Sequence, residues 1–496
     1  MNDELEQQIK RLAVRGLGWI AFSRLLTQIL ITAGNLVLVR LLFPAEFGTF
    51  AIIQFLVSLV WVFADLGLRQ ALVQRQEEPE TPLLRSVWWT HLGLGVLMAA
   101  VLWLVGPLFI SYYAGQLEPQ AVSWLRWFVV SQILVNMSLV SVGLLERRLA
   151  YKKILIGEVS ELFVTQVSTI VLAFFGFGVA SFVVGAILGK FVALVAFFWL
   201  SPWAWGVSWE WKKLRSVLSF GVPIQMSAWL GIINGAVLPL FVGRFPGPGG
   251  WSGPEAVGFV TWAGGVAALP RVLAHIIEQM IFPLMSRLQK TPELAGRYFE
   301  RMLRIVVVVM FAVAAVLFVL APEVTRLVYT PDWLPALPAL RLAIIQTIFI
   351  ATTSLALSTL LAFGEASFLR NMHALWALLQ WVLAVPLVLT LGFWGVNVAG
   401  ILVSATALYA FVRLRRYFKL ALFRIVTMPA LVATLTALSV FGVVRLFPIG
   451  NIIHLLLVGM FGGAVYSLLI FVFMRRELAR EFVFVKGVVR ELVTGR

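Results

Sequence analysis

Long apolar segments separated by short polar connections recur along the whole chain, and they predict an all-α polytopic membrane protein. Fourteen segments approach or exceed the roughly 20 residues that a membrane-spanning helix needs. Turn signals such as Phe43-Pro44 and Gly176-Phe177-Gly178 separate neighbouring segments. The predicted spans cover residues 16–42, 47–73, 83–111, 119–145, 154–175, 178–201, 214–243, 255–284, 298–321, 334–363, 369–391, 394–412, 425–446 and 451–474.

The distribution of basic residues supports this number of spans. If the N-terminus lies in the cytoplasm, twenty-nine of the 39 Lys and Arg residues fall in inner connections or in the C-terminal tail, and four fall in outer connections. Membrane proteins concentrate Lys and Arg in cytoplasmic loops, and one missed span would invert every later loop and destroy the bias. We therefore expect a multi-pass protein of the cytoplasmic (inner) membrane with both termini in the cytoplasm.

The composition excludes several other classes of protein. With 61% hydrophobic and 12% charged residues, a soluble chain could not hide its apolar surface. The net charge of +16 would favour nucleic acid as a partner of a soluble protein, but the loop bias explains it here. The absence of cysteine excludes disulfides and thiolate metal sites. The first fifteen residues are polar, no small-residue cleavage site follows them, and we expect a retained first helix.

The sequence contains no recognisable catalytic or metal-binding pattern. Its four histidines share no metal-ligand spacing, and no Ser/His/Asp set or HExxH motif is present. We therefore expect a protein that is not an enzyme and that needs no cofactor beyond a coupling H⁺ or Na⁺.

Several short matches indicate an internal repeat. Residues 35–44 (NLVLVRLLFP) precede Glu46 and Gly48, while residues 234–246 (NGAVLPLFVGRFP) precede Glu255 and Gly258. Further on, WLR ending at Arg126 matches ALR ending at Arg341. Six spans per repeat give two halves of the same orientation, between which substrate would bind. The predicted parts are a cytoplasmic segment (1–15), an N-lobe (16–201), a C-lobe (202–420), two additional helices (421–475) and a basic cytoplasmic tail (476–496).

Five cations lie inside predicted spans: Arg24, Arg126, Lys190, Arg271 and Arg341. A cation at the centre of a bilayer costs about 2.5–3.5 kcal/mol on insertion scales. Several in one chain indicate a water-filled cavity, and a basic cavity suggests an anionic cargo.

Arg271 is the strongest candidate for contact with such a cargo. His275 and Glu278 follow it by four and seven residues, so the three share one helical face. An internal ion pair that fixes helix packing is the alternative interpretation. A planar guanidinium suits phosphate because it binds two oxygens at once.

The other charged candidates also have two interpretations each. Lys190 is either a cavity charge or the partner of a carboxylate such as Glu161, and Arg24 either contacts a headgroup or snorkels to the interface. Arg126 and Arg341 either line an exit for the cargo or keep a structural role shared by the repeats. Asp65 lies four residues before Arg69, which favours a local ion pair.

Two further kinds of polar residue are candidates. Asn234 is either a cavity residue or an interhelical hydrogen-bonding group. Glu161, Glu278 and Asp65 are candidates for ion coupling.

Four sequence motifs resemble one family of transporters. They are residues 39–51 (VRLLFPAEFGTFA), 65–75 (DLGLRQALVQR), 282–289 (FPLMSRLQ) and 331–341 (PDWLPALPALR). The chain from about residue 16 to 420 resembles the polysaccharide transporter family, the Wzx-type flippases of the multidrug/oligosaccharidyl-lipid/polysaccharide (MOP) superfamily. The resemblance implies a flippase of lipid-linked oligosaccharides with a basic central cavity for a lipid diphosphate.

Two other functions compete with this expectation. A multidrug and toxin extrusion (MATE)-like multidrug/cation antiporter should show dominant carboxylates in its N-terminal lobe. A membrane-bound polymerase or ligase usually needs a large outer loop, and the longest predicted here has roughly a dozen residues. The expected partners of a flippase are a lipid-linked oligosaccharide, membrane lipids, and the polysaccharide polymerase and chain-length machinery, with no nucleic acid.

Overall fold

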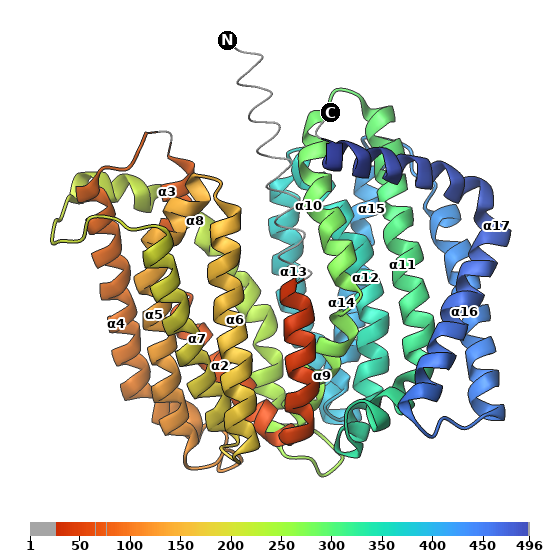
Figure 1. Ribbon diagram of the computed structural model, residues 1–496, viewed down its shortest axis with the longest axis horizontal. Coiled ribbons are helices and arrows are strands. Elements are labelled where there is room, and N and C mark those ends of the chain that lie inside the picture. The colour runs from red at the N-terminus through yellow and green to blue at the C-terminus, as the bar shows by residue number, and fades with distance from the viewer. Residues whose placement is uncertain (1–25, 65, 76, 495–496) are drawn as a thin grey trace. The chain divides into compact units, whose positions relative to one another are not determined.

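The computed structural model describes residues 26–64, 66–75 and 77–494, and all regular structure within them is helical (Figure 1). The apolar sequence explains this, because a backbone in lipid must satisfy its own hydrogen bonds and a helix does so within one segment. The described chain divides into two compact units. Each unit is a bundle of packed helices.

The first unit ends at Pro246 and also includes Gly250–Gly258. A helix at Leu26–Leu41 precedes its numbered elements. These are α2 (Pro44–Trp61), α3 (Leu68–Gln74), α4 (Thr81–Ser111), α5 (Ala121–Arg147), α6 (Tyr151–Phe174), α7 (Val179–Leu200), α8 (Trp211–Gly235) and a π-helical turn, η1 (Val237–Val242). Its main core joins α2, α4, α5 and α7 around Ile52, Leu56, Leu102 and Leu125.

Helix α9 (Gly253–Ala268) begins in the first unit and continues into the second. The second unit then contains α10 (Arg271–Arg287), α11 (Pro292–Leu327), the 3₁₀ helix η2 (Pro331–Ala336), α12 (Leu337–Ala362), α13 (Ala366–Leu391), α14 (Gly395–Thr406), α15 (Tyr409–Leu414), α16 (Leu422–Leu446) and α17 (Ile452–Thr494). Its main core surrounds Phe299 and Leu355. The α17 helix packs beside α16 and bends at Met474, where the backbone leaves helical geometry (Figure 1).

Eleven helices in the described chain are long and apolar enough to cross a membrane. The second predicted span (47–73) is divided in the structure, where α2 ends at Trp61 and α3 begins at Leu68. Three further predicted spans have no counterpart among the eleven. The described part of the first is the helix Leu26–Leu41, the seventh is α8 followed by the π-helical η1, and the eighth is interrupted between α9 and α10. Prolines mark two of these irregularities, because Pro239 lies within η1 and Pro270 directly precedes α10.

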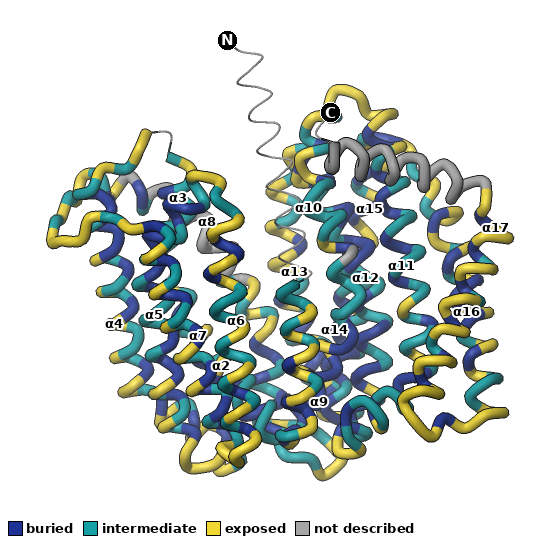
Figure 2. The backbone as a smooth tube through the Cα atoms, in the orientation of Figure 1, coloured by how far each residue is buried: buried dark blue, intermediate teal, exposed yellow. Residues whose placement is uncertain are grey.

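Exposed positions recur along most helices (Figure 2), and many of them carry large apolar side chains. Leu104 is 76% exposed, Phe174 73% and Trp199 81%. Patches of this extent are rare on soluble monomers, and lipid removes their cost. The burial pattern therefore agrees with a multi-pass membrane protein.

Structural features recur at the spacing of the sequence repeat. The Arg126 guanidinium of α5 lies 4.9 Å from the ring centre of Trp103 in α4. The Arg341 guanidinium of α12 lies 5.5 Å from the ring centre of Phe318 in α11. Trp103 and Phe318 are separated in the chain by the same interval as Arg126 and Arg341, so a cation–π contact is repeated between equivalent helices.

The same interval relates other elements. Pro107 lies inside α4 and Pro322 lies inside α11, and the same interval separates these two prolines. It also separates the start of α6 at Tyr151 from the start of α13 at Ala366. The recurrence therefore extends from single contacts to helix boundaries.

Two equivalent helix starts face each other within the first unit. A methyl group at Gly48 of α2 would lie 1.6 Å from the Pro254 carbonyl oxygen, and one at Gly258 of α9 would lie 2.0 Å from the Pro44 carbonyl oxygen. The two segments are those that the sequence repeat matches, and their contact is reciprocal. Only glycine permits so close an approach of the two backbones.

Candidate functional site

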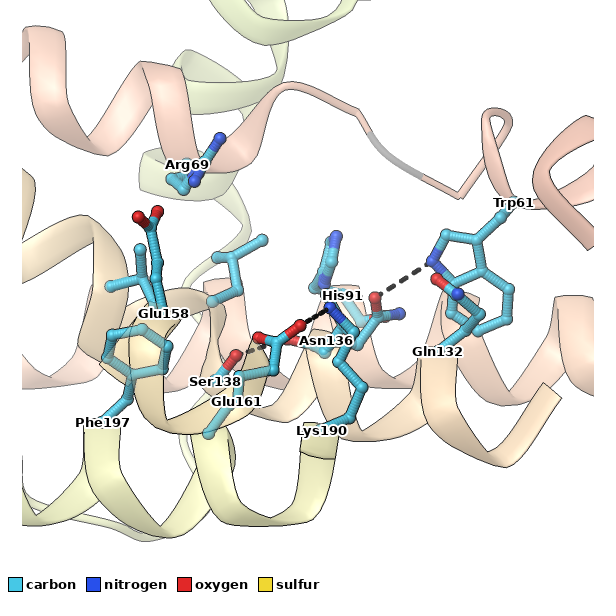
Figure 3. Close-up of a pocket in the computed structure, with 14 residues that line it drawn as sticks. Trp61, Arg69, His91, Gln132, Asn136, Ser138, Glu158, Glu161, Lys190 and Phe197 are labelled. Carbon is cyan, nitrogen blue, oxygen red and sulfur yellow. Dashed lines mark hydrogen bonds and ion pairs between the residues drawn. The ribbon is translucent and has the colours of Figure 1, made fainter. Parts of the chain in front are cut away.

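A cavity of about 280 Å³ lies within the first unit (Figure 3). Residues of α2 to α7 line it, and four of them are charged: Arg69, Glu158, Glu161 and Lys190. The volume is close to the lower end of the range of small-molecule pockets, about 300–1,000 Å³. The cavity can therefore hold a small charged group with water, but not a whole glycan.

Lys190 and Glu161 form an ion pair across this cavity. Close packing of α6 on α7 produces the pair, since a methyl group at Gly189 would lie 1.9 Å from the Thr165 hydroxyl oxygen. Small residues allow such contact between membrane helices, and the next residue along α7 is the lysine. Their side chains are 31% and 25% exposed, so the pair is neither fully dry nor fully solvated.

Arg69 on α3 adds a second cation to the cavity. Its guanidinium contacts the Glu146 carboxylate of α5 at 3.2 Å. The predicted partner, Asp65, lies outside the described residues. Glu158 lies one turn before Glu161 on α6, and Figure 3 shows its carboxylate directed toward Arg69. The charged lining is thus balanced, with two cations and two carboxylates, and is less basic than the sequence suggests.

Uncharged polar groups complete the wall. The Trp61 indole nitrogen donates to the Asn136 side-chain oxygen at 3.2 Å, and the Asn136 amide donates to the His91 carbonyl oxygen at 3.1 Å. His91 and Asn136 are 4% and 1% exposed. This polar group was not predicted, although Gln132 and Asn136 lie four residues apart in an otherwise apolar span, a spacing that indicates a polar helix face.

Arg271 belongs to the second unit and is the first residue of α10. It is half-buried, and no side chain among the described residues caps this helix start. His275 contacts Glu278 at 3.5 Å and Gln279 at 3.1 Å. Polar side chains one turn apart on α10 therefore contact one another. A helix N-terminus has unsatisfied amide groups and a partial positive charge, and both add to the attraction of this end for an anion.

The remaining candidates occupy separate positions. Arg126 donates to the Trp103 carbonyl oxygen at 3.3 Å, so its contacts are to a neighbouring helix of its own unit. Arg341 stacks on Phe318 in the second unit. Asn234 is half-buried near the end of α8. Arg24 lies outside the described residues.

Comparison with known proteins places the chain in a family. The model of the family described as "Polysaccharide biosynthesis protein" matches residues 37–338, more than half of the chain. The chain belongs to this polysaccharide biosynthesis family. The family is one of membrane transporters, which agrees with the prediction that the chain is not an enzyme.

Curated relatives of this polysaccharide biosynthesis family member are distant. The lipopolysaccharide biosynthesis protein WzxC of Escherichia coli is 22% identical over 67% of this chain and 66% of its own length. The succinoglycan biosynthesis transport protein ExoT of Rhizobium meliloti is 24% identical over 66% of this chain and 65% of its own length. The chain thus spans just under two thirds of both relatives.

Solved structures identify the fold of this family member. The lipid II flippase MurJ in an inward closed conformation is similar with a TM-score of 0.75 and 15% identity, over 92% of this chain and 99% of MurJ. An inward-facing multidrug resistance MATE transporter of the MOP superfamily has a TM-score of 0.62 and 16% identity, over 80% of this chain and 98% of its own. The fold is therefore that of the MOP superfamily, as the sequence motifs indicate.

Proposed function

We propose that the protein is a flippase that moves a polyprenyl-diphosphate-linked oligosaccharide across the cytoplasmic membrane for surface polysaccharide biosynthesis (O-antigen, capsule or exopolysaccharide). Membership of the polysaccharide biosynthesis family is the observation that carries this proposal. The cavity lined by Lys190 supports the proposal, because the diphosphate is the charged part of such a cargo and a lysine attracts it. The polysaccharide polymerase and chain-length machinery would take up the product outside.

The architecture proposed for transport has fourteen spans, with two six-helix lobes related as a parallel repeat and a C-terminal helix pair. Rocking of the lobes would give alternating access. The recurrence of cation–π contacts, prolines and helix starts at one constant interval along the chain supports the repeat. The N- and C-termini would lie in the cytoplasm.

Lys190 and Arg271 are the proposed contacts to the diphosphate. The lysine lines a cavity, and the arginine stands at a helix start that no described side chain caps. Arginine suits two neighbouring phosphate oxygens, and lysine acts as a mobile point charge. Arg24 is the proposed third contact, at the cytoplasmic side, with Asn234 as a polar cavity residue and Arg126 and Arg341 along the exit for the glycan.

A multidrug/cation antiporter is the second candidate function. Glu158 and Glu161 favour it, since both carboxylates line the cavity of the first unit. Lys190 and Arg69 lie in the same lining, however, and their positive charges oppose the entry of a cationic drug.

Deletion followed by leaflet-resolved detection of lipid-linked intermediates tests the function. We expect the oligosaccharide to accumulate in the cytoplasmic leaflet of the deletion strain. Wild-type protein should restore export, whereas Lys190→Met with Arg271→Met should not, at equal expression. Arg370→Met, which changes an exposed cation at the cytoplasmic end of the predicted span 369–391, is the matched control and should restore export. An unchanged distribution between leaflets after deletion would contradict the flippase.

A further inference from the structure

The Lys190–Glu161 pair must change when an anionic cargo enters its cavity. The ammonium group already neutralises the Glu161 carboxylate, and both side chains line the same cavity. Lysine has three donors and can contact a second anion, but its single charge cannot balance both a carboxylate and a phosphate. In a partly dry site that imbalance is costly, because water screens it poorly.

Arg69 is the other cation in the described lining of this cavity, and it already has a carboxylate partner. Arg69 of α3 is paired with Glu146 of α5, and Glu158, on the same helix as Glu161, adds a further negative charge. His91 of α4 is the remaining titratable residue in the lining. The two cations and three carboxylates, with Glu146 included, already leave a net charge of −1, and a diphosphate would add to it.

We propose that Glu161 takes up a proton when a lipid diphosphate binds to Lys190. The Lys190–Glu161 ion pair breaks, the ammonium turns to a phosphate oxygen, and a proton from water converts the free carboxylate to a carboxylic acid. On release of the diphosphate the proton leaves and the ion pair forms again. The inference rests on the proposed function and extends it by assigning Glu161 as the coupled proton acceptor.

The direction of two effects follows from this exchange. Binding of a lipid diphosphate tightens as the pH falls, because protonation of Glu161 releases Lys190. Glu161→Gln imitates the protonated carboxyl group, so it should bind a lipid diphosphate about tenfold more tightly than wild type near pH 8 and show a weaker pH dependence. A pair with only a structural role predicts the opposite, since its loss would disturb the cavity and weaken binding.

Calorimetry of the full chain in lipid nanodiscs tests the proposal, with geranylgeranyl diphosphate as the probe. Titrations in buffers of different ionisation enthalpy give the number of protons taken up per probe bound. We expect wild type to take up as much as one proton more per probe bound than Glu161→Gln. Because the same probe binds to both proteins, any proton that the probe itself exchanges cancels in this difference. Glu77→Gln, which changes an 81% exposed carboxylate outside the predicted spans, is the matched control and should behave as wild type. Lys190→Met with Glu161→Gln removes both charges and should also lose the uptake.

Three outcomes would overturn the inference. These are binding to wild type without proton uptake, unchanged uptake in Glu161→Gln, and loss of uptake in His91→Gln but not in Glu161→Gln. Failure of wild type to bind the probe would instead count against the proposed diphosphate site itself. The two failures are therefore distinguishable, and thermal unfolding of each variant separates loss of the fold from loss of the coupled proton.

Discussion

At the scale of single residues, Glu365 is a charge outside the predicted spans that has several partners, and it directly precedes α13. Its carboxylate accepts hydrogen bonds from the Arg413 guanidinium at 2.9 and 3.1 Å and from the Tyr417 hydroxyl at 2.8 Å. The two bonds from Arg413, followed by the bond from Tyr417, hold the pKa of Glu365 below its ordinary value. The group links the start of α13 to the segment that follows α14.

The lowered pKa predicts a dependence of stability on pH. A carboxyl group whose pKa is depressed by folding stabilises the fold above its unfolded pKa, about 4.3, and loses that contribution as the pH falls through the folded pKa. Glu365→Gln should therefore lower Tm at pH 7, and the difference from wild type should shrink below about pH 4. Thermal unfolding in detergent from pH 7 to pH 3.5 measures this. Glu77→Gln is the control, because Glu77 is 81% exposed and should change Tm little. An equal deficit at every pH would contradict the charge-based explanation.

At the scale of elements, glycine decides how closely helices approach. The reciprocal contact of α2 with α9 requires glycine at 48 and at 258, where any Cβ would meet a carbonyl oxygen. Gly264 lies on the same helix α9, but a methyl group there would meet nothing within 4 Å. One helix therefore offers a required glycine and a free one.

Substitution by alanine should destabilise the protein at Gly258 but not at Gly264. Gly258→Ala forces the α2 and α9 backbones apart and should cost about 2 kcal/mol or more, since overpacking of a close contact costs about 1–3 kcal/mol. Gly264→Ala should be neutral or stabilising by up to about 1 kcal/mol, because alanine is the better helix former. Thermal unfolding of both variants in one detergent makes the comparison, and similar Tm values would contradict the close contact.

The elements also show what a single sequence can and cannot predict. The long apolar runs predicted α4 to α7, α11 to α14, α16 and the part of α17 up to Met474, because their signal is local. The pairing of Glu161 with Lys190 was one of two interpretations of the sequence, since both residues interrupt neighbouring apolar helices. Arg69 and Glu146 lie far apart in the sequence with no local pattern to join them, so that contact was not predicted. The π-helical turn at Val237–Val242 was also missed, although Pro239 marked an irregular region.

At the scale of the whole molecule, charge and repetition are two independent sources of information about the same fold. The repeat relates helices whose order in the chain differs by an even number, and the loop charges favour one orientation for all of them. The cation–π contacts at Arg126 and Arg341 connect the two arguments, because equivalent residues occupy equivalent positions along equivalent helices. An orientation measured for a few loops therefore fixes the orientation of the rest.

The absence of cysteine makes that measurement direct, since each introduced cysteine is the only thiol in the protein. Glu78, Glu118, Arg370 and Gly450 are exposed residues at or near four connections between helices. With the N-terminus inside, Glu118→Cys and Gly450→Cys should react with a membrane-impermeant maleimide in right-side-out vesicles. Glu78→Cys and Arg370→Cys should react only after permeabilisation.

The four positions distinguish an error in the predicted orientation from an error in the predicted number of spans, because a different number of spans precedes each position. Reversal of all four would show that the orientation is inverted while the number of spans is right. Agreement at Glu78 and Glu118 with reversal at Arg370 and Gly450 would place an error in the number of spans between them, where the structure has the π-helical η1 and the interrupted α9–α10 helix. Since these are also the segments with prolines at their breaks, the labelling tests whether a broken helix still crosses the membrane.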